Sequence, residues 1–280
     1  MKSPLIVYTN LFTLTNRDVK VNKYIDMYYI WLFNIFKYGQ LNADDYCVSF
    51  IDEHTLEYIE NKPILKWLSM KFSNFVIIPY AQPKTIKEGI LKRYDIDSIL
   101  EVTKHIENPA YLYLDIDVLV MNDIRPLFRS QSMQKTTLYL RTEGVITNHL
   151  YYGDLITPEE MHLLRDKNML HMPGFSAGIY GWNNNATAKQ FFRFIIELAA
   201  KIDKELYTVE QPFFNAAVFN YFFKEQGIFN IALFDQTRVI DNHMVQPNTT
   251  EIILINFCGI PGDDSFHWDK LLQQLFIQAL

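Results

Sequence analysis

A chain of 280 residues is long enough for one large α/β domain or two small ones, and its 49% of apolar and 15% of aromatic residues predict a substantial core. The formal net charge of −6 at pH 7 argues against a dedicated nucleic-acid-binding protein, which would normally be basic. The only two cysteines, Cys47 and Cys258, lie in apolar runs, which predicts buried thiols rather than a disulfide framework or a zinc site.

The sequence contains no apolar stretch of the ~18 residues that a membrane-spanning helix needs. The apolar run that follows Lys2 is too short for the core of a signal peptide. We therefore expect a soluble, cytoplasmic protein without an integral membrane segment. Residues 270–280, KLLQQLFIQAL, have almost no basic face, so this last helical segment should pack on the domain or on a second subunit of a homodimer rather than on a membrane.

The first half of the chain alternates short apolar runs with helical patterns. Strands are predicted over residues 5–8, 46–51 and 75–78 and from residue 111. Helices are predicted over residues 21–38, 64–72, 84–94 and 96–106. This alternation predicts βαβ units and a mainly parallel sheet, in which the strand beginning at Tyr111 is the fourth and central one.

The second half is less regular but continues as one domain without an internal repeat or a linker. Strands are predicted over residues 137–140, 175–180 and 252–257, and helices over residues 186–206 and 210–224. A further helix should begin after Thr157, because Thr157, Pro158 and Glu160 form a capping-box pattern with proline at the first helical position.

Two carboxylates interrupt the apolar stretch YLYLDIDVLV, residues 111–120. Side chains alternate along a strand, so Asp115 and Asp117 should share a face at the carboxyl end of the central strand, where open α/β sheets bind ligands. Neighbouring carboxylates repel each other unless a cation lies between them, and Mg²⁺ and Mn²⁺ prefer such hard oxygen ligands. We therefore predict a metal site; in the alternative interpretation both residues cap the following turn.

Three further segments fall in a recognisable order around this D-x-D element. They are LIVYTN (residues 5–10), MPGFSAGIYGWN (residues 172–183) and VEQPFFNAAVF (residues 209–219). Together the four segments resemble GT-A glycosyltransferases, and more narrowly the retaining, family 8-like group that includes glycogenin and bacterial galactosyltransferases. The resemblance extends over nearly the whole chain. It implies a single GT-A (Rossmann-like) nucleotide-diphospho-sugar transferase domain over residues 1–280, with a central, mainly parallel mixed sheet.

The resemblance also implies an activity, and it assigns nucleotide binding and acceptor binding to different halves of the chain. Residues 1–122 would bind the nucleotide and residues 123–280 the acceptor. The protein would move a sugar from a nucleoside diphosphate sugar, with a uridine diphosphate sugar as the expected donor, to a hydroxyl of a glycan or other acceptor, with retention of configuration and with Mn²⁺ or Mg²⁺ as cofactor. The residues that would contact the donor are Tyr8, Thr9, Asn10, Asp115, Ile116, Ser176 and Gly178.

Gln211 and Glu210 are the predicted catalytic residues. In the enzymes that this chain resembles, a glutamine at the position of Gln211 lies near the anomeric carbon, and the adjacent carboxylate contacts sugar or acceptor hydroxyls. Alternatively, residues 208–211 form a capping-box pattern, in which Gln211 satisfies a helix amide.

Lys92 and Arg93 could contact the phosphates of the donor, although a charged residue on the protein surface is the simpler interpretation of each.

The resemblance is looser near the carboxyl end. Asn256 stands where the family has a histidine as third metal ligand, and His267 is an alternative ligand. Gly259 and Gly262 could offer backbone amides to a phosphate or form a plain turn. Lys270 could contact the β-phosphate or be a solvated lysine.

Two rival functions remain open. LDIDVLV also fits the motif of haloacid dehalogenase-like phosphatases, with Asp115 as nucleophile and Asp117 as general acid, and residues 262–264 resemble their late acidic motif. In those enzymes the nucleophile usually follows the first strand, whereas three βα units precede Asp115 here. A non-catalytic nucleotide-sugar binder is the second rival, because Asn256 replaces the family histidine.

Overall fold

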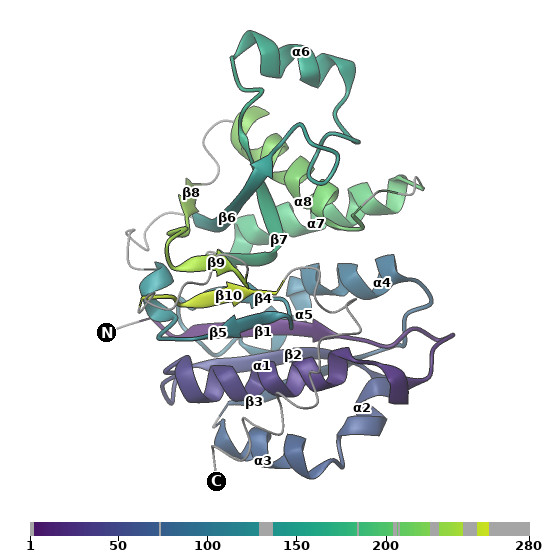
Figure 1. Cartoon of the computed structure of the whole chain (residues 1–280), viewed down its shortest axis with the longest axis vertical. Coiled ribbons are helices and arrows are strands. Elements are labelled where there is room, and N and C mark those ends of the chain that lie inside the picture. Colours follow the sequence, from purple (N-terminus) through teal and green to yellow (C-terminus); the bar gives the residue numbers. More distant parts are fainter. Residues whose placement is uncertain are drawn as a thin grey trace.

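The computed structural model describes residues 3–72, 74–128, 137–183, 185–203, 206, 208–224, 230–242 and 251–257. Its main sheet has seven strands in the order β3-β2-β1-β4-β7-β6-β8 (Figure 1). They are β1 (Leu5–Leu11), β2 (Tyr46–Asp52), β3 (Phe75–Tyr80), β4 (Ala110–Leu114), β6 (Thr137–Val145), β7 (Pro173–Trp182) and β8 (Asn230–Leu233). The first four are mutually parallel, β7 is antiparallel to β4 and β6, and β8 is parallel to β6. The predicted mixed, mainly parallel α/β sheet is confirmed.

The centre of the sheet is formed as the apolar runs predict. All seven residues of β1 are buried, as expected of a parallel strand that is covered on both faces. The strand that begins near Tyr111 is β4, which lies fourth in the strand order, so its predicted central position is also confirmed. The predicted end of β1 at Tyr8 is wrong, because Thr9 and Asn10 continue the strand and pair with β2.

A second, three-stranded sheet consists of β5 (Val118–Val120), β10 (Leu254–Asn256) and β9 (Val239–Asp241). β10 is antiparallel to β5 and parallel to β9. Asp115 and Asp117 lie in the turn that joins β4 to β5, where the Val118 amide donates to the Asp115 carbonyl at 3.0 Å. The prediction that strand alternation places these two aspartates on one face is therefore wrong, because neither belongs to a strand.

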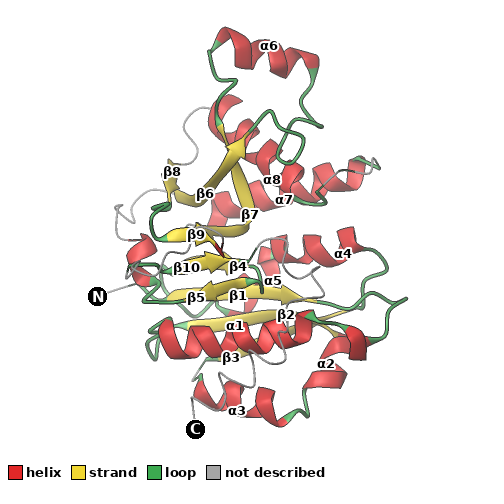
Figure 2. Ribbon diagram, in the orientation of Figure 1, coloured by secondary structure: helices red, strands yellow, loops and turns green. Residues whose placement is uncertain are grey.

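Helices cover both faces of the main sheet (Figure 2). One face, which includes Leu5 and Val7, packs against α1 (Tyr24–Tyr38), α2 (Glu53–Ile59) and α3 (Pro63–Lys71). The other, which includes Ile6 and Tyr8, packs against α5 (Ile96–Val102), α7 (Asn185–Lys201) and α8 (Gln211–Val218). α4 (Ile86–Leu91) runs into the 3₁₀ turn η2 (Lys92–Tyr94) ahead of α5. No helix in the described ranges is long and apolar enough to span a bilayer.

Several predicted helices end early, although their starts are close to the prediction. The helix predicted over residues 210–224 ends as an α-helix at Val218 and continues as a π-helical segment, Phe219–Lys224. α6 (Pro158–Asp166), at the far end of the molecule in Figure 1, has both hydrogen bonds of the predicted capping box. That helix start is confirmed.

The sequence patterns did not predict α2, β8 or β9. α2 has only seven residues, too few for a periodic apolar pattern, and its start depends on Asp52 at the end of β2. The Asp52 carboxylate is fully buried and accepts hydrogen bonds from the amides of Thr55 at 3.1 Å and Thr13 at 2.9 Å. It thus caps α2 and also fixes the segment that leaves β1.

We predict that Asp52→Ala lowers the free energy of unfolding by about 2–3 kcal/mol, because the change removes a helix cap and leaves two amides without their acceptor. Urea denaturation measures the loss. Thr85→Ala removes an exposed cap of α4 and is the matched control, with an expected loss of about 1 kcal/mol or less. Equal losses in the two variants would contradict a special role for Asp52.

Candidate active site

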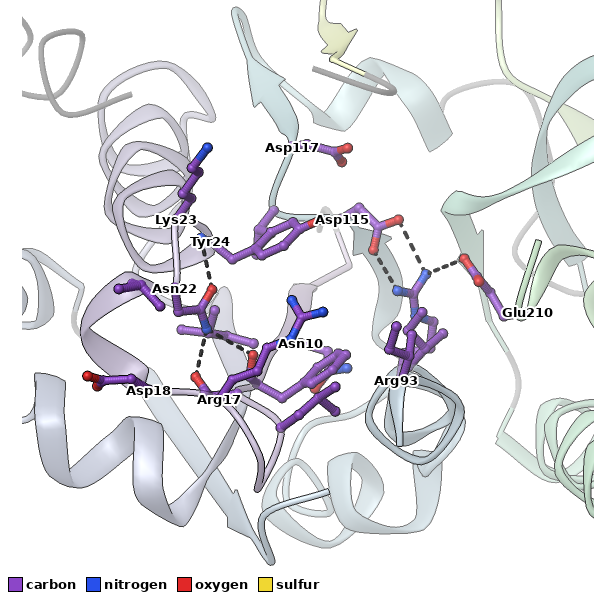
Figure 3. Close-up of a pocket in the computed structure, with 18 residues that line it drawn as sticks. Asn10, Arg17, Asp18, Asn22, Lys23, Tyr24, Arg93, Asp115, Asp117 and Glu210 are labelled. Carbon is purple, nitrogen blue, oxygen red and sulfur yellow. Dashed lines mark hydrogen bonds and ion pairs between the residues drawn. The ribbon is translucent and has the colours of Figure 1, made fainter. Parts of the chain in front are cut away.

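A cavity of about 530 Å³ opens beside the carboxyl ends of β1 and β4 (Figure 3). Its walls come from the segment that follows β1 up to Tyr24, from α4, and from the turn that carries Asp115 and Asp117. Arg93 and Glu210 complete the lining. The cavity therefore lies at the edge of the sheet where open α/β folds bind their ligands.

Arg93 is the buried cation of this site. Its side chain is only 7% exposed, and Nη2 lies 3.0 Å from Oδ1 of Asp115 while Nη1 lies 3.5 Å from Oε1 of Glu210. Nη1 also donates to the carbonyl of Ala177 at 3.3 Å. We refer to Arg93, Asp115 and Glu210 as the Arg93 cluster. Burial acts to lower the pKa of Arg93, but Asp115 and the other anionic neighbours outweigh it, so the guanidinium remains charged.

The position of Asp115 is fixed by several further contacts. Its Oδ1 accepts a hydrogen bond from the Tyr113 hydroxyl at 2.5 Å, and its amide donates to the Gly178 carbonyl at 2.9 Å. A Cβ atom on Gly178 would lie 2.6 Å from Oδ2 of Asp115, so only glycine leaves room for the carboxylate here. This close approach explains why glycine follows Ala177 in β7.

In Figure 3, Asp117 lies apart from Arg93, and no dashed line joins it to the other residues drawn. Burial, and then the negative charge of Asp115, raise the pKa of Asp117 to about 7. Burial also raises the pKa of Glu210, partly offset by Arg93. Burial is the largest cause of both shifts, so the surroundings of these two carboxylates disfavour their charged forms.

Five of the residues predicted for the site line the cavity, namely Asn10, Asp115, Ile116, Asp117 and Glu210. Asn10 uses both ends of its amide within the protein, since Nδ2 donates to the Gly89 carbonyl at 2.8 Å and Oδ1 accepts from the Tyr80 hydroxyl at 3.0 Å. Its side chain therefore helps to hold α4 against β1.

Tyr8 and Thr9 lie behind the cavity rather than on its surface. Both are fully buried, and the Tyr8 hydroxyl donates to that of Tyr180 at 3.3 Å and accepts from Trp182 Nε1 at 3.2 Å. Tyr8 is thus part of an aromatic cluster, in edge contact with the rings of Tyr113 and Tyr180. The structure does not bring these two predicted residues to the ligand-accessible surface.

Gln211 is the first residue of α8 and connects two other segments. Its Oε1 accepts from the Ala177 amide at 3.4 Å and its Nε2 donates to the Leu150 carbonyl at 3.3 Å. The alternative interpretation as a capping box is wrong, because Glu210 is the N-cap residue and no side chain caps the helix. Thr208 instead donates to the Leu150 carbonyl at 2.9 Å. Ser176 lies nearby, where its hydroxyl accepts from the Gly178 amide at 3.3 Å.

Asn256 is not among the residues that line the cavity, but it lies in the second sheet beside the turn that carries Asp115 and Asp117. It pairs with Val118 across β10 and β5, and the amide of Phe257 donates to the Asp117 carbonyl at 3.0 Å. In the described part of the chain, no group of three or more His, Cys, Asp or Glu side chains could hold a metal. A metal at Asp115 and Asp117 would therefore need another kind of donor there, and the Asn256 amide oxygen is a suitable one. Predicted residues Gly259, Gly262, His267 and Lys270 lie outside the described residues.

The structure also shows a buried residue in the wall of the cavity that the sequence interpretation undervalued. Surface charge was the simpler interpretation of Arg93, and for this residue it is wrong. A signal was present, since Ile86, Ile90 and Arg93 follow helical spacing and all three line the cavity. Lys92, in contrast, is partly exposed and pairs with Asp95 at 2.5 Å.

No family model matches the sequence, and no curated protein sequence is similar to it. Solved structures do match. A glycosyltransferase involved in the glycosylation of the major capsid of PBCV-1 is 11% identical, with a TM-score of 0.50 over 98% of this chain and 99% of that one. The galactosyltransferase LgtC, in complex with donor and acceptor sugar analogs, is 13% identical, with a TM-score of 0.53 over 97% of this chain and 94% of its own.

A third match is the glycosyltransferase GlyE of Streptococcus pneumoniae TIGR4, at 13% identity and a TM-score of 0.50 over 99% of this chain and 64% of that one. Sequence identities this low establish a shared fold. The chain therefore has the GT-A glycosyltransferase fold that its four motifs predict.

We predict that Arg93→Met lowers the free energy of unfolding by about 3 kcal/mol, because it leaves Asp115 and Glu210 buried without their counter-ion. The double variant Arg93→Met/Glu210→Gln should recover part of this loss, because it buries one carboxylate fewer. Lys92→Met is the control and should cost less than about 1 kcal/mol. Chemical denaturation of the four proteins measures the differences, and equal effects of Arg93→Met and Lys92→Met would rule out the Arg93 cluster as a stabilising element.

Proposed function

We propose that this protein is a metal-dependent glycosyltransferase that moves a sugar from a nucleoside diphosphate sugar, with a uridine diphosphate sugar as the expected donor, to a hydroxyl acceptor. The observation that carries the proposal is the turn with Asp115 and Asp117, which lies at the carboxyl end of the central strand and opens on a cavity of about 530 Å³. Such a volume is typical of small-molecule sites. We treat residues 1–280 as one functional unit, with the nucleotide on the side of residues 1–122 and the acceptor on the side of residues 123–280.

Asp115, Asp117 and Asn256 would hold Mn²⁺ or Mg²⁺, since together they offer two carboxylates and an amide oxygen, all hard donors. When bound, the ion supplies positive charge that stabilises the departing diphosphate. Asp115 and Asp117 lie in one turn that borders the cavity, which supports a cation at this position.

The residues of the chain have separate tasks in this proposal. Arg93 holds Asp115 and Glu210 in fixed orientations, and Glu210 accepts hydrogen bonds from sugar or acceptor hydroxyls. Gln211 stays the candidate for contact with the anomeric carbon, next to Ala177. For retention, the acceptor oxygen bonds to the anomeric carbon on the face that the diphosphate leaves, while a phosphate oxygen takes the acceptor proton.

The two rivals differ from this proposal in what they require of the site. In a phosphatase of the haloacid dehalogenase-like class the nucleophile usually follows the first strand of the chain, whereas Asp115 follows the fourth, β4. A non-catalytic binder needs the same cavity and is favoured only by the replacement of histidine by Asn256. The place of Asp115 in the chain therefore favours transfer chemistry over phosphate hydrolysis.

We expect one nucleotide sugar in a panel to raise the melting temperature by roughly 5–10 °C at about 100 times its Kd, and only when Mn²⁺ or Mg²⁺ is present. Asp117→Asn should abolish the metal-dependent part of this shift, because it removes a charged ligand. Asp97→Asn changes a carboxylate that is 60% exposed and pairs with Lys189 on the surface, so its shift should equal that of the wild type. Differential scanning fluorimetry measures all three proteins.

The same protein samples distinguish the rival functions. Turnover of p-nitrophenyl phosphate with Mg²⁺, without any effect of nucleotide sugars, would replace the proposal by the phosphatase. Metal-dependent binding without transfer or hydrolysis of any donor, even with excess Mn²⁺, would replace it by the non-catalytic binder.

A further inference from the structure

The segment between β1 and α1, residues 12–23, forms one wall of the cavity and contributes Arg17 to it. In Figure 3 this segment lies on the left of the cavity, and Arg93 and Glu210 lie on its right. Arg17 is exposed, and its side chain makes no hydrogen bond or ion pair in the part of the chain that the structure describes. Of the two arginines that line the cavity, Arg93 is therefore already paired and Arg17 is available to a ligand.

Hydrogen bonds hold this wall of the cavity in place. The Thr13 amide donates to the buried carboxylate of Asp52 at 2.9 Å, and Nδ2 of Asn22 donates to the Thr13 hydroxyl at 2.7 Å. The Arg17 amide donates to the Leu14 carbonyl at 3.0 Å, which closes a turn at Arg17 itself. The backbone that carries Arg17 is thus fixed before a ligand binds, which lowers the entropy cost of a contact with its side chain.

The charge of Arg17 is separated from the negative charges that border the same cavity. Arg17 forms no ion pair with Asp115 or Asp117, although all three line the cavity. Tyr24, another lining residue, is close enough to respond to each of them: burial, and then Asp117 and Asp115, raise the pKa of its hydroxyl, while Arg17 acts to lower it. A ligand that fits this cavity should therefore present a negative group to Arg17.

We propose that Arg17 binds the diphosphate of the nucleoside diphosphate sugar from the segment that follows β1. The inference rests on the proposed function, because it needs a diphosphate in this cavity. Arginine suits the role, since its guanidinium stays charged and can donate two parallel hydrogen bonds to phosphate oxygens. Arg17 thus neutralises the diphosphate on the side of the cavity away from Glu210.

Arg17→Gln tests the proposal, because it removes the charge and keeps a polar side chain at an exposed position. We expect uridine diphosphate to bind the whole chain roughly 10-fold more weakly in the presence of Mg²⁺, because a charge-assisted hydrogen bond is lost. Isothermal titration calorimetry measures this affinity, and competition with uridine diphosphate gives that of uridine. Uridine has no phosphate and should bind both proteins equally. Arg17→Lys keeps the charge and should recover part of the loss.

Lys20→Gln is the matched control. Lys20 is an exposed cation of the same segment, but it is not among the residues that line the cavity. Both variants remove one positive charge, so a general electrostatic attraction of anions to this segment would be weakened to a similar extent in the two. A direct contact of Arg17 with the diphosphate predicts instead that Lys20→Gln keeps the affinity for uridine diphosphate within about twofold of the wild type.

The outcomes separate this inference from the proposed function. If the wild type binds uridine diphosphate and Arg17→Gln binds it equally well, or weakens no more than Lys20→Gln, the role of Arg17 is refuted and the nucleotide site stands. An equal loss of uridine and uridine diphosphate also refutes it, because the effect would not depend on phosphate.

If the wild type does not bind uridine diphosphate, the expected donor is refuted and inorganic pyrophosphate becomes the probe. A roughly 10-fold weaker affinity of Arg17→Gln for pyrophosphate, with Lys20→Gln unchanged, would then support Arg17 as a diphosphate ligand independently of the nucleoside. A wild-type protein that binds neither compound refutes both the proposed function and the role of Arg17.

Discussion

A buried guanidinium between two carboxylates is the interaction on which the candidate site depends. Asp115 follows β4 and Glu210 precedes α8, and Arg93 contacts them at 3.0 Å and 3.5 Å. Each of these three charges would be costly to bury alone, so each depends on the others for its position. Their ion pairs fix the end of the central strand against the start of α8, two segments that are far apart in the sequence. All three line the cavity, which therefore takes its shape from this contact.

The parts of the fold that could be predicted from the sequence have local causes. The apolar run of β1, the helical spacing that leads to Gly39, and the capping box at Thr157 each depend on neighbouring residues only. The alternation of strands and helices then restricts the topology, because parallel neighbours need a crossover. For this reason the central place of the strand before Asp115 was predictable, and with it the location of the candidate site.

The features of the fold and of the candidate site that could not be predicted from the sequence depend on tertiary contacts. Arg93 and Lys92 are neighbours in the sequence, but only one of them meets a buried carboxylate, and only the fold decides which. The turn at Asp115 follows from the way β5 leaves the main sheet to pair with β10, near the other end of the chain. β9 has just three residues, which is too short for a recognisable strand pattern in the sequence. Its position, which places Asp241 beside Asn256, could therefore not be predicted.

The turn that carries Asp117 lies beside the Arg93 cluster, in which two carboxylates share one guanidinium. Arg141 is likewise placed between two carboxylates, those of Glu143 and Asp241. Burial raises the pKa of Asp117, of Glu143 and of Glu210, so several carboxylates here are held in surroundings that disfavour their charge. In the function proposed above, a bound cation would offset this negative charge and would stabilise the departing diphosphate.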